Sequence, residues 1–384
     1  MITADDQSRD LLSTLQYSSR IYKNLGSVTS ATRSAWFESH RLCRLVARIA
    51  NLSRQLTARE NINPQRTKIN DVTKAHDFQQ SDSSLAIFIS RESLTVCTKT
   101  LEAAIAAVPK KGKIELLVNG NAALAQSLAK LVQNDLFQRV RVWDIPLGDK
   151  GNAWNSYIHE VWRGECVVFF IDGYVRLFPD SLERLYQTLS SNPDAFGGSG
   201  VPSVGRTSNA VAREMIKNGG FHGNLCCLTY TAISELKQRN IKIVVGTYRV
   251  DSLMGSIICY GLDTTSKEWN QKRLVVDPLA TWDLDVKRWW RWSDLQAKIR
   301  QFERQLRGKF ENAAIKNLFI TQNISPEMLP TNCYKLIEQW ASVDQTEYRK
   351  FASRHPFATL AYKRHLQKKL SFEQAGVIKL LTHR

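Results

Sequence analysis

Residues 148–185 read GDKGNAWNSYIHEVWRGECVVFFIDGYVRLFPDSLERL, and this stretch indicates the fold most clearly. The apolar run VVFFID ends at Asp172 and has the length of a buried strand. Residues 153–163 before it and residues 180–189 after it have the apolar spacing of helices. The order helix, buried strand, helix is typical of a parallel α/β sheet, in which a helix connects each strand to the next.

The same alternation extends upstream. Apolar runs at 85–90 (LAIFIS), 113–118 (KIELLV) and 139–146 (RVRVWDIP) alternate with helical segments at 98–108 and 122–132. Four such alternations predict an α/β fold with a Rossmann-like, mostly parallel sheet flanked by helices. Ligands of such sheets bind beyond the carboxyl ends of the strands, so the residues that follow each run are the candidates for a site.

Both flanks of this region differ from it. From Leu42 onward, leucines and isoleucines recur at helical spacing with arginines between them, and residues 61–84 are polar without periodicity. After Trp282 the spacing becomes helical again. We therefore expect a basic helical extension with a linker at 1–80, a catalytic-type domain at 81–282 and a basic helical region at 283–384.

Composition excludes several classes of protein. The chain has 384 residues, 43% of them hydrophobic, and its apolar runs fall short of the roughly 18 residues that span a bilayer. Its first residues, MITADDQSRD, do not resemble a secretory signal. Seven cysteines without a CxxC pair indicate neither a disulfide framework nor a zinc site, so we expect a cytoplasmic protein.

The net charge of +17 is concentrated at the two ends. Residues 1–80 hold 12 basic and 7 acidic side chains, residues 81–280 hold 22 and 19, and residues 281–384 hold 19 and 10. Basic flanks favour an anionic partner such as a membrane surface, although a solvated surface gives the same pattern. Nucleic acid is a weaker candidate, because the flanks follow no RNA-binding module.

The glycine-rich residues 197–209 (GGSGVPSVGRTSN) predict a mobile loop. They lack the Gly-Lys-Ser/Thr ending of a phosphate loop.

The central region resembles the family 2 glycosyltransferases of the GT-A fold. Lys150, Gly151, Ala153 and Asn155 are similar to the turn and helix of that family, and VVFFID followed by Pro179 and Leu182 is similar to its Asp-x-Asp strand and the next helix. The resemblance covers residues 85–281, about half of the chain. It implies a GT-A-type sheet that binds a nucleotide sugar and transfers the sugar to an acceptor hydroxyl.

The resemblance implies which residues bind the donor. Asp172 contacts the ribose or a metal ion, Lys150 and Asn155 belong to the turn motif, and Ser90, Glu92 and Asn119 follow the first two strands. An Asn119 amide can pair with a nucleobase edge, but Asn119-Gly120 is equally typical of a tight turn.

The metal motif departs from the family pattern. Tyr174 stands where the family has its second acid, and a neutral phenol is a poor ligand for Mn²⁺ or Mg²⁺. Three arrangements are open: Asp172 alone binds the ion with phosphate and water, His222 adds a ligand, or Lys150, Arg176 and Arg206 neutralise the pyrophosphate without metal. We favour the first, with a divalent cation as cofactor.

An inverting transferase also needs a base for the acceptor hydroxyl. Asp251 follows IKIVVGTYRV, which resembles a strand, and stands where the family has its base; the alternative role is a helix cap. Arg206, His222 and Trp289 are candidates for contacts with the pyrophosphate or the acceptor.

The sequence thus predicts a non-processive glycosyltransferase, inverting and dependent on a nucleotide sugar. Its acceptor is a glycan or a lipid-linked molecule, as in cell-envelope or exopolysaccharide synthesis, and the basic flanks hold it at the inner face of the membrane. The alternative is a GT-A-like scaffold that lost its activity and binds a membrane or another anionic partner; Tyr174 favours it.

Overall fold

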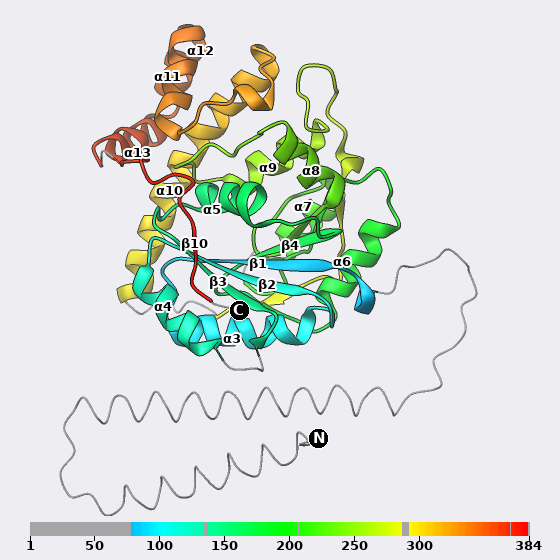
Figure 1. The fold of residues 1–384 in the computed structure, drawn as a ribbon. Helices are drawn as coiled ribbons and strands as arrows, with labels where there is room; N and C mark the ends of the chain where they lie inside the picture. The colour runs from blue at the N-terminus through cyan, green and yellow to red at the C-terminus, as the bar shows by residue number, and fades with distance from the viewer. Residues whose placement is uncertain (1–77, 134–136, 206–207, 286–291, 369, 383–384) are drawn as a thin grey trace, which may run out of the picture. The chain divides into compact units, whose positions relative to one another are not determined.

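The computed structural model describes residues 78–133, 137–205, 208–285, 292–368 and 370–382. Its centre is an eight-stranded sheet with the strand order β10-β3-β2-β1-β4-β7-β6-β8 (Figure 1). A separate two-stranded sheet consists of β5 and β9. The N-terminal extension expected at 1–80 falls almost entirely outside the described residues.

The first four strands of the large sheet are parallel to one another, as the alternating pattern predicts. Their apolar residues are buried on both faces, because helices cover both sides of a parallel sheet. These strands are β1 (Ser83–Ile89), β2 (Lys113–Asn119), β3 (Val140–Ile145) and β4 (Val167–Asp172).

Four further strands, β6, β7, β8 and β10, extend this sheet at its two edges, while β5 and β9 pair only with each other. β7 is antiparallel to β4 and to β6, whereas β6 is parallel to β8. β10 is antiparallel to β3 and forms the opposite edge. The bounds are β5 (Arg176–Leu177), β6 (Gly197–Ser199), β7 (Cys226–Thr229), β8 (Leu274–Val276), β9 (Trp282–Asp283) and β10 (Lys379–Leu380).

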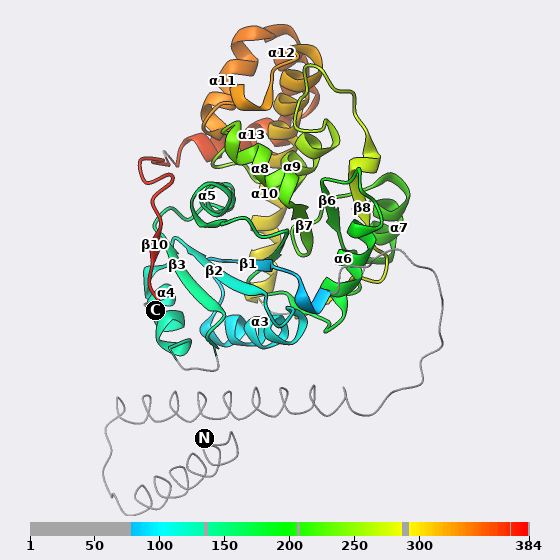
Figure 2. The same cartoon turned by 45° about the vertical axis from the view of Figure 1, so that its right-hand side comes forward.

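Helices cover both faces of the sheet. α3 and α4 lie beneath it in Figures 1 and 2, with α6 packed against α3, while α5, α8 and α9 lie above it. Their bounds are α3 (Leu94–Ala107), α4 (Ala122–Leu131), α5 (Lys150–Ser156), α6 (Ser181–Ser190), α7 (Ser208–Asn218), α8 (Tyr230–Gln238) and α9 (Val250–Cys259).

An aromatic stack joins α5 to the sheet. The rings of Trp154 and Phe170 have centroids 4.0 Å apart, and the ring of Phe88 lies 5.4 Å from that of Trp154. All three residues are buried. Because large buried rings contribute much of the apolar area removed from water, this stack fixes the start of α5 against β1 and β4.

The C-terminal helices continue the same apolar core. Phe310 is fully buried, and its ring stacks on that of Tyr362 with centroids 5.1 Å apart. These helices are α10 (Trp292–Lys316), α11 (Cys333–Val343), α12 (Gln345–Arg354) and α13 (Pro356–Leu366). The chain then returns to the sheet and ends beside β3 (Figure 2).

The prediction of a mobile loop at 197–209 is wrong at both ends of this range, because residues 208–209 belong to α7 and the first three residues belong to a strand. Residues 197–199 form the buried strand β6 and not a mobile loop. Glycine is required there because a Cβ at Gly197 would lie 2.7 Å from the Cys227 carbonyl oxygen, and one at Gly200 would lie 2.2 Å from that of Ala280. A glycine-rich run can therefore be a close-packed strand as well as a loop.

Two further observations concern cysteines and membranes. The six cysteines in the described part of the chain are all free thiols. Over that same part, no helix combines the length and the apolar character needed to cross a bilayer.

Candidate active site at the carboxyl edge of the sheet

Three elements bring charged side chains together. β4 ends at Asp172, α5 begins at Lys150, and Asp251 lies in the first turn of α9. The strand end places Asp172 at the carboxyl edge of the sheet, where parallel α/β sheets bind their ligands. α9 begins one residue before Asp251, so the aspartate is not its N-cap; that position belongs to Arg249.

The Lys150 ammonium forms ion pairs with both carboxylates. Its Nζ lies 2.7 Å from Asp172 Oδ1 and 3.2 Å from Asp251 Oδ1. The side chains are 27%, 17% and 31% exposed for Lys150, Asp172 and Asp251, so all three remain accessible at the surface. We call these three residues the edge cluster.

The Lys150 ammonium keeps its charge at neutral pH. Burial alone would lower the pKa of Lys150, but the charges of Asp172 and Asp251 outweigh burial and raise this pKa above its ordinary value. The lysine is therefore a permanent cation. An ammonium has three N–H donors, so two carboxylates leave one donor for a ligand.

The second oxygen of Asp172 is held by neutral groups. The Tyr174 hydroxyl donates to Asp172 Oδ2 at 2.9 Å. The Asn224 amide is oriented so that both its nitrogen and its oxygen form hydrogen bonds. The nitrogen donates to Asp172 Oδ2 at 3.1 Å, and the oxygen accepts from Trp282 Nε1 at 3.2 Å. Burial, followed by the charge of Asp172, raises the pKa of Tyr174, which keeps the phenol neutral and able to donate.

Gly223 packs directly against Asp251. A Cβ at this glycine would lie 2.3 Å from Asp251 Oδ2, closer than any real contact allows. Only glycine leaves room for the carboxylate in its present position. Sequence reasoning missed Gly223 and Asn224; the run GGFHGN, which drew attention to His222, contains both.

The side chains at this edge do not form a metal site by themselves, and the expectation that Asp172 binds a cation together with phosphate and water stays a prediction. Lys150 Nζ lies between the carboxylates of Asp172 and Asp251, where a cation shared by them would lie. In the described part of the chain, no group of three or more His, Cys, Asp or Glu side chains could hold a metal ion. A hard cation needs several oxygen ligands, so these side chains do not fit a divalent cation held by the protein alone.

His222 is half-buried beside the edge cluster. Its Nδ1 accepts the backbone N–H of Asn224 at 3.2 Å, and its ring lies 5.0 Å from that of Trp282. Burial lowers the pKa of His222, partly opposed by Asp251 and Asp172. The structure thus gives this histidine a structural contact near the predicted site; its role as a metal ligand stays a prediction.

Three of the predicted donor residues stabilise the loops at this edge. Glu92 accepts the backbone N–H of Ser90 at 2.6 Å and so closes the turn after β1. Asn119 is buried and donates to the Ile89 carbonyl oxygen at 2.7 Å, which joins the ends of β1 and β2. Ser90 and Asn119 both lie at the carboxyl ends of strands, as expected.

Asn155, predicted to bind the donor, is buried and bonded to the backbone of another segment. Its buried amide donates to the Ile243 carbonyl oxygen at 2.9 Å and accepts the Ile243 N–H at 2.8 Å. These bonds fasten α5 to the extended segment before α9. That segment is not a strand of the described sheet, because its bridge is the single pair Val245 and Asn332. The remaining predicted residues, Arg206 and Trp289, lie outside the described residues.

Two adjoining pockets run along α9 away from Asp251. One has a volume of about 510 Å³ and the other about 280 Å³, and they share Ser252, Ser256 and Trp269. Trp269 is 52% exposed, and its ring meets that of Tyr260 edge to face at 5.3 Å. Phe221 lines the smaller pocket and precedes His222 and Gly223 in the chain, and Ser252, which lines both pockets, follows Asp251.

Comparison with known proteins identifies the fold. No protein-family model matches the chain, and no curated protein matches its sequence. Among solved structures, it is similar to the mannosyltransferase PcManGT from Pyrobaculum calidifontis in complex with GDP-Man and Mn²⁺, with a TM-score of 0.51. The sequences are 13% identical, and the match covers 86% of this chain and 99% of the other. The chain therefore has a glycosyltransferase-type fold.

Proposed function

We propose that the protein is an inverting glycosyltransferase that moves a sugar from a nucleoside diphosphate sugar to an acceptor hydroxyl. The observation that carries this proposal is the edge cluster, in which Lys150 joins Asp172 and Asp251 at the carboxyl edge of a glycosyltransferase-type sheet. The similar mannosyltransferase was solved with GDP-Man, which makes GDP-mannose the first donor to test.

In this proposal the donor lies across the carboxyl ends of β1, β2 and β4. The nucleoside lies near Ser90 and Asn119, and Asp172 contacts its ribose. The Lys150 ammonium directs its remaining N–H to a diphosphate oxygen. As the bond to the sugar breaks, negative charge grows on the diphosphate, and this fixed cation stabilises it.

Asp251 acts as the general base. Its carboxylate takes the proton from the acceptor hydroxyl as that oxygen attacks the anomeric carbon. The bond between this carbon and the diphosphate oxygen breaks, and the nucleoside diphosphate leaves with the bonding electrons. Attack opposite the leaving group inverts the configuration. Gly223 allows the base to stay at this position because it leaves space for the carboxylate.

The groove along α9 receives the acceptor. Trp269 offers an exposed ring face on which the C–H groups of a sugar can stack, and Ser252 and Ser256 offer hydroxyls for hydrogen bonds. A partly aromatic groove with hydroxyl groups and one basic side chain, Lys316, suits a glycan or the sugar of a lipid-linked acceptor, as in cell-envelope or exopolysaccharide synthesis at the cytoplasmic side.

A donor screen tests the proposal. The full-length protein is incubated with GDP-mannose and with common UDP-sugars, and the release of nucleoside diphosphate is measured with and without glycan acceptors. Parallel reactions contain Mn²⁺, Mg²⁺ or a chelator. The similar mannosyltransferase was solved with Mn²⁺, whereas the side chains described here form no group of three or more metal ligands. We expect at least one donor to be consumed.

Two variants assign the roles. Asp251→Asn should lower the rate of transfer by about 10²–10⁴-fold and leave donor binding intact, because it removes only the base. Asp172→Asn should weaken donor binding. Glu183→Gln, at a partly exposed position of α6, is the matched control and should behave as the wild type. Unchanged transfer by Asp251→Asn would falsify the assignment of the base.

A binding scaffold without activity is the second candidate, and Tyr174 favours it. Its hydroxyl occupies an oxygen of Asp172 that a metal-bound donor would use in the family pattern. Thermal unfolding with GDP and UDP, with and without Mn²⁺, separates the two candidates. Stabilisation by a nucleotide supports the transferase, and no stabilisation by any of them supports the scaffold.

A further inference from the structure

We propose that the outer face of α13 is a docking surface for a membrane that contains anionic lipids. This α13 face consists of Phe357, Leu360, Lys363, Arg364 and Gln367. Positions three, four and seven apart lie on one side of a helix, so these residues form one continuous stripe. All five are exposed.

The opposite side of α13 holds the helix in place. Ala358, Ala361, Tyr362 and His365 are buried there. Tyr362 stacks on Phe310, the central ring of the C-terminal helices. Because this packing fixes the rotation of α13, the stripe on the other side cannot turn inward to bury its apolar residues.

The apolar side chains of the α13 face are unusually exposed. Phe357 is 72% exposed and Leu360 is 47% exposed. Leu366 and Leu370, which follow in the chain, are 40% and 43% exposed. Water disfavours large apolar side chains, so several of them on one exposed segment indicate a surface that is covered by something apolar.

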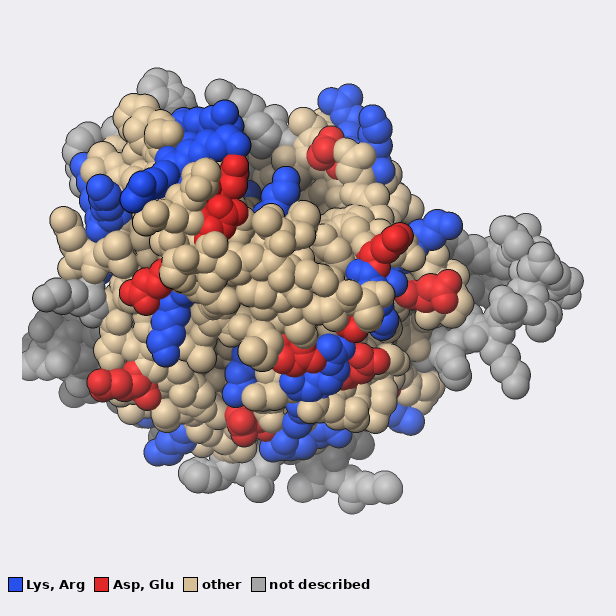
Figure 3. Space-filling view, turned by 90° about the horizontal axis from the view of Figure 1, so that it is seen from above, with Lys and Arg blue, Asp and Glu red and all other residues tan. Residues whose placement is uncertain are grey.

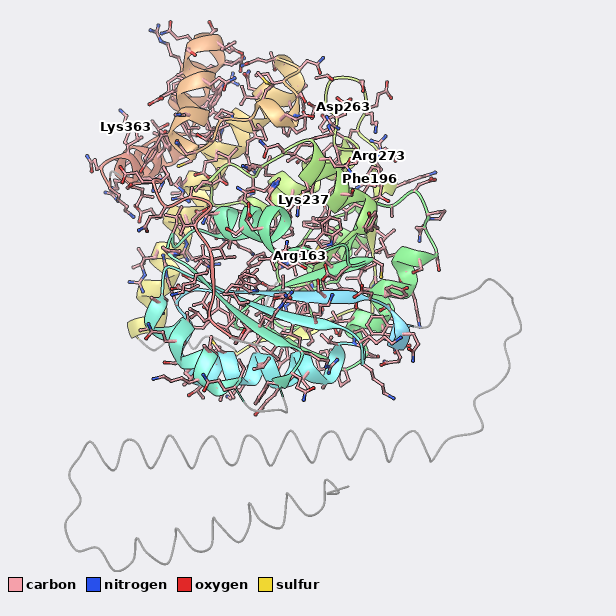
Figure 4. All side chains as sticks on the ribbon, viewed as in Figure 1. Arg163, Phe196, Lys237, Asp263, Arg273 and Lys363 are labelled. Carbon is pink, nitrogen blue, oxygen red and sulfur yellow. The ribbon has the colours of Figure 1, made fainter. Side chains whose placement is uncertain are left out.

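Basic side chains lie beside these apolar ones. Lys363 and Arg364 belong to the stripe itself, and Arg354 and Lys368 flank the helix at its two ends. α13 contains no Asp or Glu. Figure 3 shows Lys and Arg gathered over the C-terminal helices on the left of the view, and Figure 4 shows Lys363 on the outer side of α13.

An anionic bilayer matches both properties of this face. Lipid headgroups attract the basic side chains, and the boundary between headgroups and acyl chains accepts Phe357 and Leu360. Nucleic acid would match the charge but provides no apolar phase for Leu360. The inference does not depend on the proposed sugar transfer, since binding to vesicles is measured without substrate.

Vesicle co-sedimentation of the full-length protein tests the inference. The protein is mixed with phosphatidylcholine vesicles that contain or lack phosphatidylglycerol, and the bound fraction is measured at low and high salt. We expect binding only with phosphatidylglycerol, weakened by salt because screening reduces the attraction of the headgroups. Each basic residue near such a surface contributes about fivefold in affinity.

Two double variants separate the apolar and the basic contributions. Phe357→Ser with Leu360→Ser, and Lys363→Glu with Arg364→Glu, should each reduce binding at least tenfold. The control is Lys99→Glu with Lys130→Glu, which changes the net charge by as much as the Lys363→Glu, Arg364→Glu variant. Its substitutions lie on α3 and α4, beneath the sheet, so it should reduce binding much less (Figure 1). Thermal unfolding should show that all variants remain folded, since the substituted side chains are exposed.

Three results would overturn the inference. The first is the absence of binding to phosphatidylglycerol vesicles. The second is binding that both α13 variants retain, which would assign it to another part of the chain. The third is binding to single-stranded RNA that the Phe357→Ser, Leu360→Ser variant retains in full, with no binding to vesicles.

Discussion

Two clusters of charged residues meet at the start of α5, where Asp149 belongs to one cluster and Lys150 to the other. Lys150 is the centre of the edge cluster. Asp149, the residue before it, caps α5 and belongs to a buried cluster with Arg307, Glu311 and His365. Each cluster joins acids to a single permanent cation.

The clusters differ in how their hydrogen-bonding groups are used. In the buried cluster, Arg307 Nε lies 3.0 Å from Glu311 Oε1, and its Nη atoms donate to His365 Nδ1 at 2.9 Å and to the Gly246 carbonyl oxygen at 3.2 Å. Glu311 also accepts the Tyr248 N–H at 2.8 Å. Both Nη atoms of the arginine thus donate to the protein, whereas its Nε faces Glu311 without a hydrogen bond; these contacts make the cluster a structural joint between α10, α13 and the segment before α9.

The edge cluster is accessible and retains one donor of Lys150. The comparison teaches that similar sets of charges serve different purposes according to burial and to the donors that remain free. A cation that is 14% exposed and donates from both Nη atoms to the protein fixes the scaffold, whereas one that is 27% exposed with a spare donor can bind a ligand.

Removal of the buried cation should have the largest effect. Arg307→Met leaves Glu311 without its ionic partner in the interior, and breaking a buried pair costs about 3–5 kcal/mol. Urea unfolding should show a loss of that size. Arg349→Met, on the exposed side of α12, is the control and should change the free energy of unfolding little. A loss below about 1 kcal/mol would show that Arg307 is not a structural joint.

Removal of the accessible cation should affect activity instead. Lys150→Met takes away the charge that stabilises the leaving diphosphate, so we expect transfer to fall by about 10²–10³-fold. The free energy of unfolding should change much less than in Arg307→Met. Lys150→Arg retains the charge and should recover part of the rate. Equal losses of stability in the two variants would contradict the distinction between the clusters.

The pH dependence of stability should also separate the clusters. Burial raises the pKa of Glu311 to about 7 from its ordinary 4.5. Between these values the folded protein binds more protons than the unfolded chain, so this residue's contribution to stability falls as the pH rises from 4.5 to 7. The slope is at most about 1.4 kcal/mol per pH unit.

Glu311→Gln isolates this contribution. The lowered pKa of His365, about 4, acts in the opposite direction below pH 6.5, so the wild type alone shows only the sum. We expect the stability of wild type relative to Glu311→Gln to decrease across pH 4.5–7, measured by urea unfolding at fixed ionic strength. A difference independent of pH would contradict the raised pKa.

The smallest expected effect tests the position of Asp251. Gly223→Ala introduces a Cβ that would overlap the carboxylate, so Asp251 must move and transfer should fall about tenfold, the equivalent of about 1.4 kcal/mol. Ser127→Ala, on the exposed side of α4, is the control, because it lies outside the edge cluster and the groove. Equal activity of the two variants would show that the position of Asp251 tolerates displacement.

The sheet was predictable because each of its first four strands is a short apolar run followed by a helix. Asp172 was found for the same reason, since an acid that ends such a run stands out. The sequence also drew attention to Lys150 and Asp251, which the structure brings to one place; their roles remain predictions. The sequence did not show that Lys150 forms ion pairs with both Asp172 and Asp251, because Lys150 and Asp251 are about a hundred positions apart.

Other features depended on tertiary contacts. Asn155 fits a motif of the turn, but only the fold shows that the backbone of Ile243 uses both ends of its amide. Residues 197–199 have the composition of a loop, and only the packing of Gly197 and Gly198 against Cys227 explains the glycines of a strand. Local composition cannot reveal which distant backbone comes close.

β10 has a consequence for how the chain is made. It covers β3 at the edge of the sheet, and the N–H of Val142 donates to Thr382, 240 positions later. Synthesis proceeds at roughly 5–20 residues per second, so β3 emerges from the ribosome with its backbone unpaired on that side for tens of seconds. Unpaired strand edges invite association with other chains, and the final residues of β10 end this exposure. A shortened C-terminus should therefore reduce the yield of soluble protein before it affects any step of chemistry.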